Sequence, residues 1–318
     1  MKCIVTGGAG FIGSHLVDML IDEGHQVISI DNESADSNED FYWNPKCNKA
    51  VVDICEYHKM EPLFEGVDWV FHLAAEARIQ PAIENPTKAA STNVVGTCNV
   101  LQASRVNKVD RVIYSSTSSA YGLSNKPPLR EDMPNDCLNP YSVTKVAGEE
   151  LCKMYHSLFG LKTIIFRYFN VYGERQPVKG QYAPLIGIFL RQVDNKEPMT
   201  IVGSGKQRRD FTHVRDVANI NCLAATSADK NVFGETFNVG VGTNYSVLEV
   251  TNMIGSKCVH IPERLGEAKE TLADISKAKN LLGWKPTIFL PEWIQNNRNF
   301  CSGAETIGAS RWLLEGLK

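Results

Sequence analysis

The chain has 318 residues, of which 43% are hydrophobic and 22% charged, and its formal net charge is -3. These values are ordinary for a globular protein, and the small net charge gives no reason to expect a nucleic acid or an acidic membrane as the partner. No apolar run approaches the roughly 20 residues of a membrane span, and no signal peptide is recognisable at the start. The nine cysteines include no Cys-x-x-Cys pair. We therefore expect a cytoplasmic protein with reduced thiols and without a metal site.

Strands and helices alternate in the first half of the chain. Short apolar runs predict the strands, and apolar residues at helical spacing predict the helices between them. In chain order, the predicted elements are strand 2–6, helix 12–23, strand 25–31, strand 67–73, helix 86–107, strand 111–115, helix 140–158 and strand 162–168. This alternation predicts an α/β fold with a Rossmann-type doubly wound parallel sheet, covered by helices on both faces.

The regular alternation ends near residue 170. Residues 173–180 and 203–209 are loop-like, and strands no longer follow helices in a fixed order. We expect a first domain over residues 1–170, to which a segment near 212–240 returns. A smaller C-terminal α/β domain is expected over residues 171–318.

The turn after the first predicted strand is rich in glycine. Gly7, Gly10 and Gly13 would permit a tight turn, close approach of the backbone to a pyrophosphate, and close packing of the next helix. A glycine-rich turn alone is a weak signal, but Asp31 ends the second strand 18 residues after Gly13. A carboxylate there can accept hydrogen bonds from the adenosine ribose and repels a 2′-phosphate. We therefore expect NAD as the cofactor.

Tyr141 and Lys145 lie four residues apart in the predicted helix 140–158, which places both side chains on one helix face. A lysine ammonium close to a phenol favours the phenolate, so Tyr141 could serve as a general base. This pair alone is common on solvated helix faces. It gains weight from the five hydroxyl residues at positions 115–119, which follow a predicted strand. Ligands bind at the carboxyl ends of strands in open α/β sheets.

Taken together, these motifs resemble the extended short-chain dehydrogenase/reductase family over nearly the whole chain. Within that family, the sequence is most similar to the nucleotide-sugar 4-epimerases. Beside the glycine-rich turn and Tyr-x-x-x-Lys, the resemblance rests on His72-Leu73-Ala74-Ala75, Asn93, Tyr121-Gly122, Arg167-Tyr168-Phe169-Asn170-Val171-Tyr172-Gly173, Arg209-Asp210-Phe211 and Leu282-Gly283-Trp284.

The resemblance implies a role for each matching position. Tyr141 is expected to be the catalytic base, Lys145 to tune it and hold the nicotinamide ribose, and Thr117 to contact O4 of the sugar. The other expected NAD contacts are Gly7, Gly10, Phe11, Ile12, Gly13, Asp31, Asn32, Asp53, Ile54, Leu73, Ala74, Ala75, Asn93, Ser115 and Tyr168. The other expected substrate contacts are Asn170, Leu185, Thr200, Val202, Arg209, Arg264, Glu267 and Thr271.

The residues after Thr117 bear on the type of reaction. Related dehydratases and decarboxylases carry carboxylates there, whereas this chain has Ser118 and Ser119. The resemblance therefore favours an NAD-dependent epimerase that inverts C4 through a 4-keto intermediate, because that reaction needs only removal and return of a hydride. A reductase that consumes NAD in stoichiometric amounts and a catalytically silent NAD sensor are the alternatives of other classes.

Two positions bear on the sugar. Thr271 stands where epimerases restricted to glucose and galactose often have a tyrosine, so a UDP-sugar with an N-acetyl group could fit as well as UDP-glucose. Arg78 departs from the usual pattern and could be a surface charge or could reach a sugar carboxylate or a phosphate. A UDP-glucuronate 4-epimerase, or another nucleotide-sugar oxidoreductase, is therefore the alternative, and UDP itself is inferred from the resemblance alone.

The predicted helices 86–107 and 140–158 match those through which relatives form dimers. Their apolar stripes could equally pack on the sheet, so a homodimer is expected only by analogy.

Overall fold

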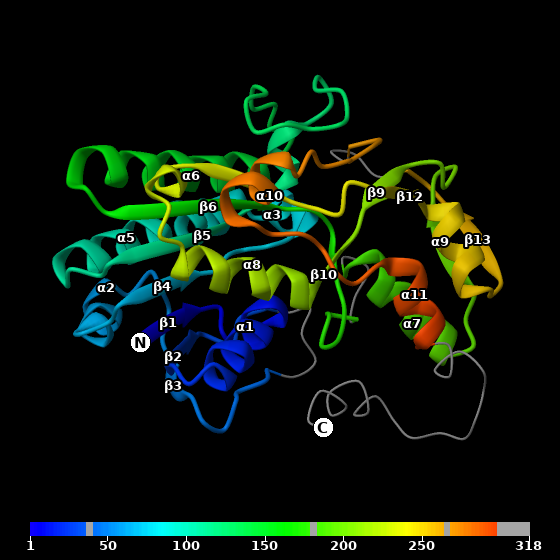
Figure 1. The fold of residues 1–318 in the computed structure, drawn as a ribbon. Helices are drawn as coiled ribbons and strands as arrows, with labels where there is room; N and C mark the ends of the chain where they lie inside the picture. Colours follow the sequence, from blue (N-terminus) through cyan, green and yellow to red (C-terminus); the bar gives the residue numbers. More distant parts are fainter. Residues whose placement is uncertain (36–40, 179–182, 264–267, 298–318) are drawn as a thin grey trace.

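A sheet of seven parallel strands forms the centre of the larger lobe (Figure 1). The computed structural model describes residues 1–35, 41–178, 183–263 and 268–297. The strands of the central sheet are β1 (Lys2–Thr6), β2 (Gln26–Asp31), β3 (Asn48–Val51), β4 (Trp69–His72), β5 (Arg111–Thr117), β6 (Lys162–Tyr168) and β11 (Thr236–Val239). Their order in space is β11-β6-β5-β4-β1-β2-β3, so the chain reverses direction across the sheet where β1 lies next to β4. The predicted doubly wound parallel sheet is confirmed.

Helices cover both faces of this sheet (Figure 1). One face carries α1 (Phe11–Asp22), α8 (Val214–Thr226) and α10 (Ser276–Leu282), and the other carries α2 (Tyr57–Met60), α5 (Thr97–Val106) and α6 (Pro140–Phe159). Side chains of β1 alternate between the faces: Cys3 and Val5 pack with α1 and α8, whereas Ile4 packs with α5 and α6. Because both faces are buried, the inner strands β1, β4, β5 and β6 are rich in apolar residues.

The predicted helix 86–107 is present but is not one regular α-helix. It consists of α4 (Pro86–Ala90), a π-helical segment η2 (Ser91–Gly96) and α5. Two short elements, β3 and α3 (Ile79–Glu84), are not predicted by the sequence pattern. Three of the four residues of β3 are exposed, so this edge strand has no apolar pattern to recognise. The 3-10 helices η1 (Glu61–Phe64), η3 (Ser118–Tyr121) and η4 (Lys230–Val232) are similarly short.

Local signals at both ends of α6 explain its bounds. The side chain of Asn139 accepts a hydrogen bond from the backbone N–H of Ser142 at 2.9 Å, and the Ser142 hydroxyl accepts one from the backbone N–H of Asn139 at 3.3 Å. Pro140 occupies the first helical position, where no backbone N–H is needed. Gly160 ends the helix with a φ of +72°, which favours glycine. The predicted helix 140–158 is therefore confirmed almost to its ends.

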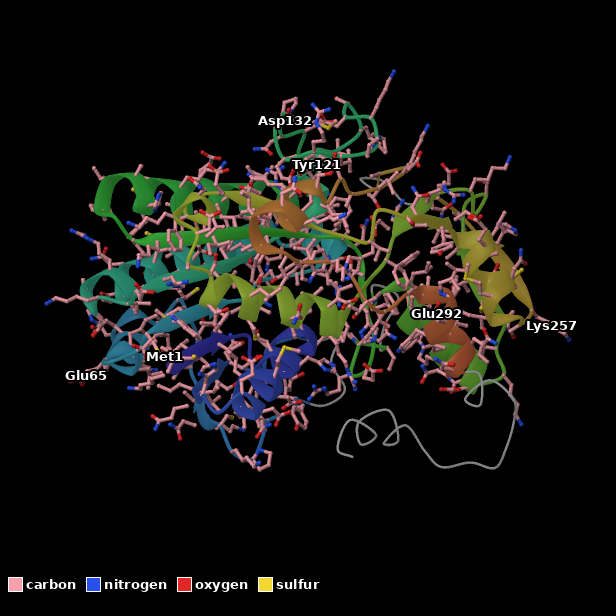
Figure 2. All side chains as sticks on the ribbon, viewed as in Figure 1. Met1, Glu65, Tyr121, Asp132, Lys257 and Glu292 are labelled. Atoms are coloured by element: carbon pink, nitrogen blue, oxygen red, sulfur yellow. The ribbon has the colours of Figure 1, made fainter. Side chains whose placement is uncertain are left out.

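The smaller lobe lies beyond the carboxyl ends of the central strands (Figure 1). Its elements are α7 (Leu185–Asp194), β8 (Met199–Val202), β9 (Arg208–Asp210), β12 (Asn244–Ser246), α9 (Val247–Ile254), β13 (Cys258–Ile261) and α11 (Leu290–Asn296), with the short pair β7 (Val171–Tyr172) and β10 (Thr212–His213) joining it to the larger lobe. It has its own apolar core, which includes Phe189 and Trp293. Figure 2 shows Lys257 at the outer end of this lobe and Met1 and Glu65 at the opposite end of the molecule.

Two predictions concern the second half of the chain. The expected loop 203–209 overlaps the first two residues of β9, which pairs with β12. The division of the chain at residue 170 stays a prediction, although β11 lies in the central sheet. In the described ranges, no helix is long and apolar enough to cross a membrane.

Candidate active site

The carboxyl ends of β1, β2, β4, β5 and β6 border a cavity of about 810 Å³, which continues to the smaller lobe. Nearly all of the sequence-predicted site residues line it. These are Gly7, Gly10, Phe11, Ile12, Gly13, Asp31, Asn32, Asp53, Ile54, Leu73, Ala74, Ala75, Ser115, Thr117, Tyr141, Lys145, Tyr168, Asn170, Leu185, Thr200, Val202, Arg209 and Thr271. The predicted substrate residues Arg264 and Glu267 lie outside the described residues.

The glycine-rich turn lies where the amino end of α1 meets the cavity. Gly7 has a φ of +70° and donates its backbone N–H to the carbonyl of Ile30 at 2.7 Å, which ties the turn to β2. A Cβ atom at Gly13 would lie 2.1 Å from the carbonyl oxygen of Gly7. No larger residue fits there, so the glycines let the turn pack closely against the first turn of α1, where the helix has N–H groups without a partner inside the helix.

Three polar side chains border the cavity at the ends of β2 and the following loops. The carboxylate of Asp31 accepts backbone hydrogen bonds from Ala9 at 3.1 Å and Glu33 at 2.8 Å, and burial raises its pKa despite these bonds. The amide of Asn32 donates to the carboxylate of Asp53 at 2.8 Å. This arrangement holds two carboxylates beside the glycine-rich turn in the wall of the cavity, where they could accept hydrogen bonds from ligand hydroxyls.

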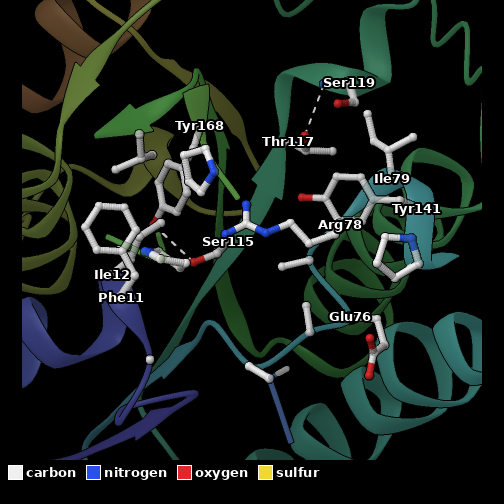
Figure 3. A pocket seen from close by; sticks show the side chains of 18 of the residues that line it. Phe11, Ile12, Glu76, Arg78, Ile79, Ser115, Thr117, Ser119, Tyr141 and Tyr168 are labelled. Carbon is white, nitrogen blue, oxygen red and sulfur yellow. Dashed lines mark hydrogen bonds between the residues drawn. The ribbon is translucent and has the colours of Figure 1, made fainter. Parts of the chain in front are cut away.

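A hydrogen-bonded chain lies between the glycine-rich turn and the carboxyl end of β5 (Figure 3). Ser115 donates its hydroxyl to the hydroxyl of Tyr168 at 3.1 Å, and the Tyr168 hydroxyl also accepts from the amide of Asn221 at 2.8 Å. Asn221 is fully buried on α8 and was not among the predicted site residues. The only sequence signal for it is a polar residue within an otherwise apolar helix face, which is too weak to identify it.

Thr117, Tyr141 and Lys145 come together at the end of the cavity next to this chain. Figure 3 shows the hydroxyl of Tyr141 directed toward Thr117, which ends β5. Burial raises the pKa of Tyr141, while hydrogen bonding to Thr117 and the charge of Arg78 lower it. The ammonium of Lys145 lies 4.3 Å from the ring centre of Tyr114 instead. Arg78 is thus the cation that lowers the pKa of Tyr141 here, and the expected tuning by Lys145 stays a prediction.

The substrate side of the cavity is built around Asn170. Its backbone has a φ of +27°, and its amide donates to the carbonyl of Asp210 at 2.9 Å and to the hydroxyl of Thr271 at 3.2 Å. Arg209 and Thr200 line the cavity from β9 and β8. The cavity thus has polar lining residues from the smaller lobe as well as from the ends of the central strands, which suits a ligand that spans both lobes.

Comparison with known proteins identifies the family to which this chain belongs. Residues 3–240 match the model of the NAD dependent epimerase/dehydratase family. The chain belongs to this family. A putative UDP-glucose 4-epimerase of Methanocaldococcus jannaschii is 38% identical over 92% of this chain and 98% of its own length. NAD is the cofactor of the family.

Two solved structures are similar over nearly the full length of this family member. UDP-glucose 4-epimerase from Thermotoga maritima, solved with UDP-glucose, is 34% identical with a TM-score of 0.88, and the match covers 94% of this chain and 98% of that one. UDP-glucuronic acid 4-epimerase from Bacillus cereus, solved with UDP-glucuronic acid and NAD, is 32% identical with a TM-score of 0.86 and covers 95% and 99%. The relatives thus include enzymes named for a neutral sugar and for an acidic one.

A buried ion pair links α6 to β6 in this member of the epimerase/dehydratase family. Arg167 donates to both carboxylate oxygens of Glu149, at 2.9 and 2.7 Å, and the two side chains are 3% and 0% exposed. Glu149 also accepts from the hydroxyl of Ser116 at 2.5 Å. Glu149 follows Lys145 by one helical turn, which is the signal that could have found it. The pair joins α6 to β5 and β6 directly behind Thr117.

Asn93 is the predicted cofactor residue that does not line the cavity. It is fully buried in η2, and its amide group accepts from the backbone N–H of Glu76 at 2.8 Å and donates to the Glu76 carbonyl at 3.1 Å. It also donates to the hydroxyl of Thr144 at 3.0 Å. Asn93 therefore holds the segment that follows β4, and its expected contact with NAD stays a prediction.

Proposed function

We propose that this protein is an NAD-dependent epimerase that inverts C4 of a UDP-linked sugar. The proposal rests on the position of Thr117 and Tyr141, which lie close together at the inner end of the cavity. The side of the cavity formed by the central strands fits NAD, and the side formed by the smaller lobe fits a UDP-sugar. Ser118 and Ser119 supply no carboxylate beside Thr117, so the acid/base group needed for dehydration is missing from that position. Epimerisation requires no further acid.

The residues at the carboxyl ends of the strands fit NAD. Gly7 and Gly13 have no room for a Cβ because the turn packs closely on the segment after β4 and on the start of α1, as in the tight glycine-rich turn of a dinucleotide site. Asp31 lies at the end of β2, where a carboxylate favours an unphosphorylated ribose. Ser115 and Tyr168 border the space between the glycine-rich turn and Tyr141. NAD held by these residues would supply a hydride acceptor and donor for C4 of the sugar.

Tyr141 is proposed to take the proton of O4 and to return it after the sugar has turned. Thr117 is placed to hydrogen-bond the same oxygen, and it favours the deprotonated form of Tyr141. Lys145 is proposed to hold the nicotinamide ribose. Across the cavity, Asn170 and Arg209 are proposed to hold the diphosphate, about which the sugar swings, because an arginine fork makes paired hydrogen bonds with phosphate oxygens.

The proposed substrates are UDP-glucose, UDP-galactose and the corresponding N-acetylhexosamines. Thr271 is compact and buried and lines the cavity, and its hydroxyl is already engaged by Asn170. Its small volume supports room for a 2-acetamido group. An acidic sugar, as in UDP-glucuronate, is the second candidate, and Arg78 is the observation that favours it.

The test is incubation of the purified protein, without added NAD, with UDP-glucose, UDP-N-acetylglucosamine and UDP-glucuronate in separate reactions. Proton NMR is expected to show conversion at C4 of at least one of them, because the cofactor is regenerated in each cycle. Turnover that requires stoichiometric NAD would favour a reductase. Bound NAD without conversion of any UDP-sugar would overturn the proposed reaction.

We also propose a cytoplasmic homodimer with an NAD-binding domain over 1–170 and a substrate domain over 171–318. Large apolar side chains are exposed on α6, among them Val143 and Leu158, and on η2 at Val95. Exposed apolar residues on neighbouring helices support pairing with a second copy. Light scattering on the eluting peak of a gel-filtration column measures the mass, and a monomer at micromolar concentration would contradict the dimer.

A further inference from the structure

The side chain of Arg78 reaches the catalytic end of the cavity from a firmly held segment. Arg78 precedes α3 with an extended backbone, and its carbonyl accepts a hydrogen bond from Ala82 at 3.2 Å. Two residues earlier, Asn93 clamps the backbone of Glu76. Figure 3 shows the side chain crossing the cavity below Tyr141, with the guanidinium between Tyr141 and the Ser115–Tyr168 pair.

The charge of Arg78 is not balanced within the protein. Its guanidinium has no hydrogen bond and no ion pair with any residue of the described ranges, and burial lowers its pKa. The nearest carboxylate along the chain, Glu76, is paired with Lys88 at 2.7 Å. Lys145 adds a second basic group at the same end. The half-buried guanidinium lines the cavity, so an anion that binds there could pair with it.

The other anionic groups of the proposed ligands have different partners. The pyrophosphate of NAD fits the glycine-rich turn, and the diphosphate of the substrate fits Asn170 and Arg209 on the substrate side. The nicotinamide ring and the sugar ring would share the space beside Tyr141 and Thr117, and of these two only the sugar can carry an anionic substituent. An anion that meets Arg78 there must therefore be a substituent of the sugar, and the planar guanidinium is the group that pairs best with a carboxylate.

We propose that Arg78 forms a carboxylate subsite and that the substrate is a nucleotide-linked uronic acid, an inference that rests on the proposed 4-epimerase activity. Among the substrates considered above, this places the acidic sugar ahead of the neutral ones. The C5 carboxylate pairs with the guanidinium while O4 faces Tyr141 and Thr117. Arg78 is thus a specificity-determining residue, and the room beside Thr271 is compatible with a 2-hydroxyl or a 2-acetamido group on the same acid.

The experiment compares wild type, Arg78→Met and Arg78→Lys, with Arg209→Met as the matched control for a diphosphate-side arginine. Conversion of UDP-glucuronate, UDP-glucose and UDP-N-acetylglucosamine is followed by NMR, and binding of UDP-glucuronate and of UDP alone by calorimetry. Melting temperature and bound NAD verify that each variant is folded and loaded. Wild type is expected to convert UDP-glucuronate with the highest kcat/KM.

Loss of a hydrogen-bonded charge pair predicts that Arg78→Met weakens UDP-glucuronate binding about 10-fold to 100-fold. Binding of UDP alone, which has no sugar carboxylate, should change far less, and Arg78→Lys should recover part of the loss. Arg209→Met should weaken UDP-glucuronate and UDP together. This contrast separates a sugar-carboxylate contact from a diphosphate contact.

Two results would overturn the carboxylate subsite. If wild type prefers UDP-glucose or UDP-N-acetylglucosamine, or if Arg78→Met affects UDP and UDP-glucuronate equally, Arg78 contacts a part shared by all substrates and the proposal fails while the epimerase stands. If no UDP-sugar is converted, the proposed function fails. The calorimetric comparison then still decides whether Arg78 recognises the carboxylate.

Discussion

Two regions border the end of the cavity at Thr117 and Tyr141, and they differ in whether their arginine has a carboxylate partner. The β5–α6 wall comprises Ser116, Thr117, Tyr141, Lys145 and Glu149, and the buried guanidinium behind it, that of Arg167, has a carboxylate on two of its nitrogens. The segment 76–81 carries Arg78, whose guanidinium lacks a partner within the part of the chain that the structure describes.

The difference indicates separate duties for the two regions. A buried charge whose partner comes from the same chain contributes to positioning and is costly to disturb. A charged side chain that lines the cavity without a partner, such as Arg78, does not help to position other residues, and its charge is available to a ligand. Substitutions in the wall should therefore affect chemistry and folding, whereas substitutions in the segment should affect the choice of substrate.

The largest effect is expected for Tyr141→Phe. Removing the hydroxyl removes the proposed base, and loss of a positioned general base typically costs about 10²-fold to 10⁴-fold in rate. The phenyl ring keeps its packing, so NAD should remain bound at the wild-type level. Turnover is measured by NMR and cofactor content by absorbance after denaturation. A variant with near-normal turnover would remove Tyr141 from the mechanism.

Glu149→Ala should come second, through stability. It leaves Arg167 buried without a carboxylate, and breaking a buried ion pair on one side typically lowers the free energy of unfolding by about 3–5 kcal/mol. Arg78→Met is the matched control in segment 76–81 and should change the free energy of unfolding by no more than about 0.5 kcal/mol. Urea denaturation measures both. Equal losses in the two variants would contradict the distinction between wall and segment.

The smallest effect is expected in the pH dependence of stability. Burial lowers the pKa of Lys145 from 10.5 to about 7, with Glu149 acting in the opposite direction. Between these pH values the unfolded chain binds a proton that the folded chain has released, so this group makes stability rise with pH from about 7 toward 10.5. Lys145→Met should remove that part of the rise. Melting temperatures at pH 7 and pH 9 test it, and identical slopes for both proteins would refute it.

Much of the fold followed from local patterns. Apolar runs separated by amphipathic segments predicted the central strands and the helices α1 and α6, whose ends are marked by Asn139 and Gly160. The exposed edge strand β3 and the short α3 were not predicted, because neither has an apolar periodicity. The π-helical segment η2 was not predicted either, since the backbone hydrogen-bond pattern there follows from packing.

The residues of the candidate site also differ in whether local sequence patterns predict them. The glycine-rich turn, Asp31 and the Tyr-x-x-x-Lys pair could be recognised because each depends on spacing within one strand–turn–helix unit or one helix. Asn221 and Arg167 could not be recognised in this way, because each forms its hydrogen bonds with a residue that is distant in the sequence. Asn93 was expected among the cofactor contacts, yet its side chain turns to the backbone of Glu76.

The sequence by itself therefore predicted a parallel sheet, the glycine-rich turn and the proximity of Tyr141 to Lys145, because short-range spacing controls these features. Only the tertiary structure decided which charges are paired. Glu149 meets Arg167 across 18 residues and Ser116 across 33, while Arg78 meets no carboxylate in the described ranges. Electrostatic balance depends on which segments are packed together and shielded from water, and a linear pattern of charges does not contain that information.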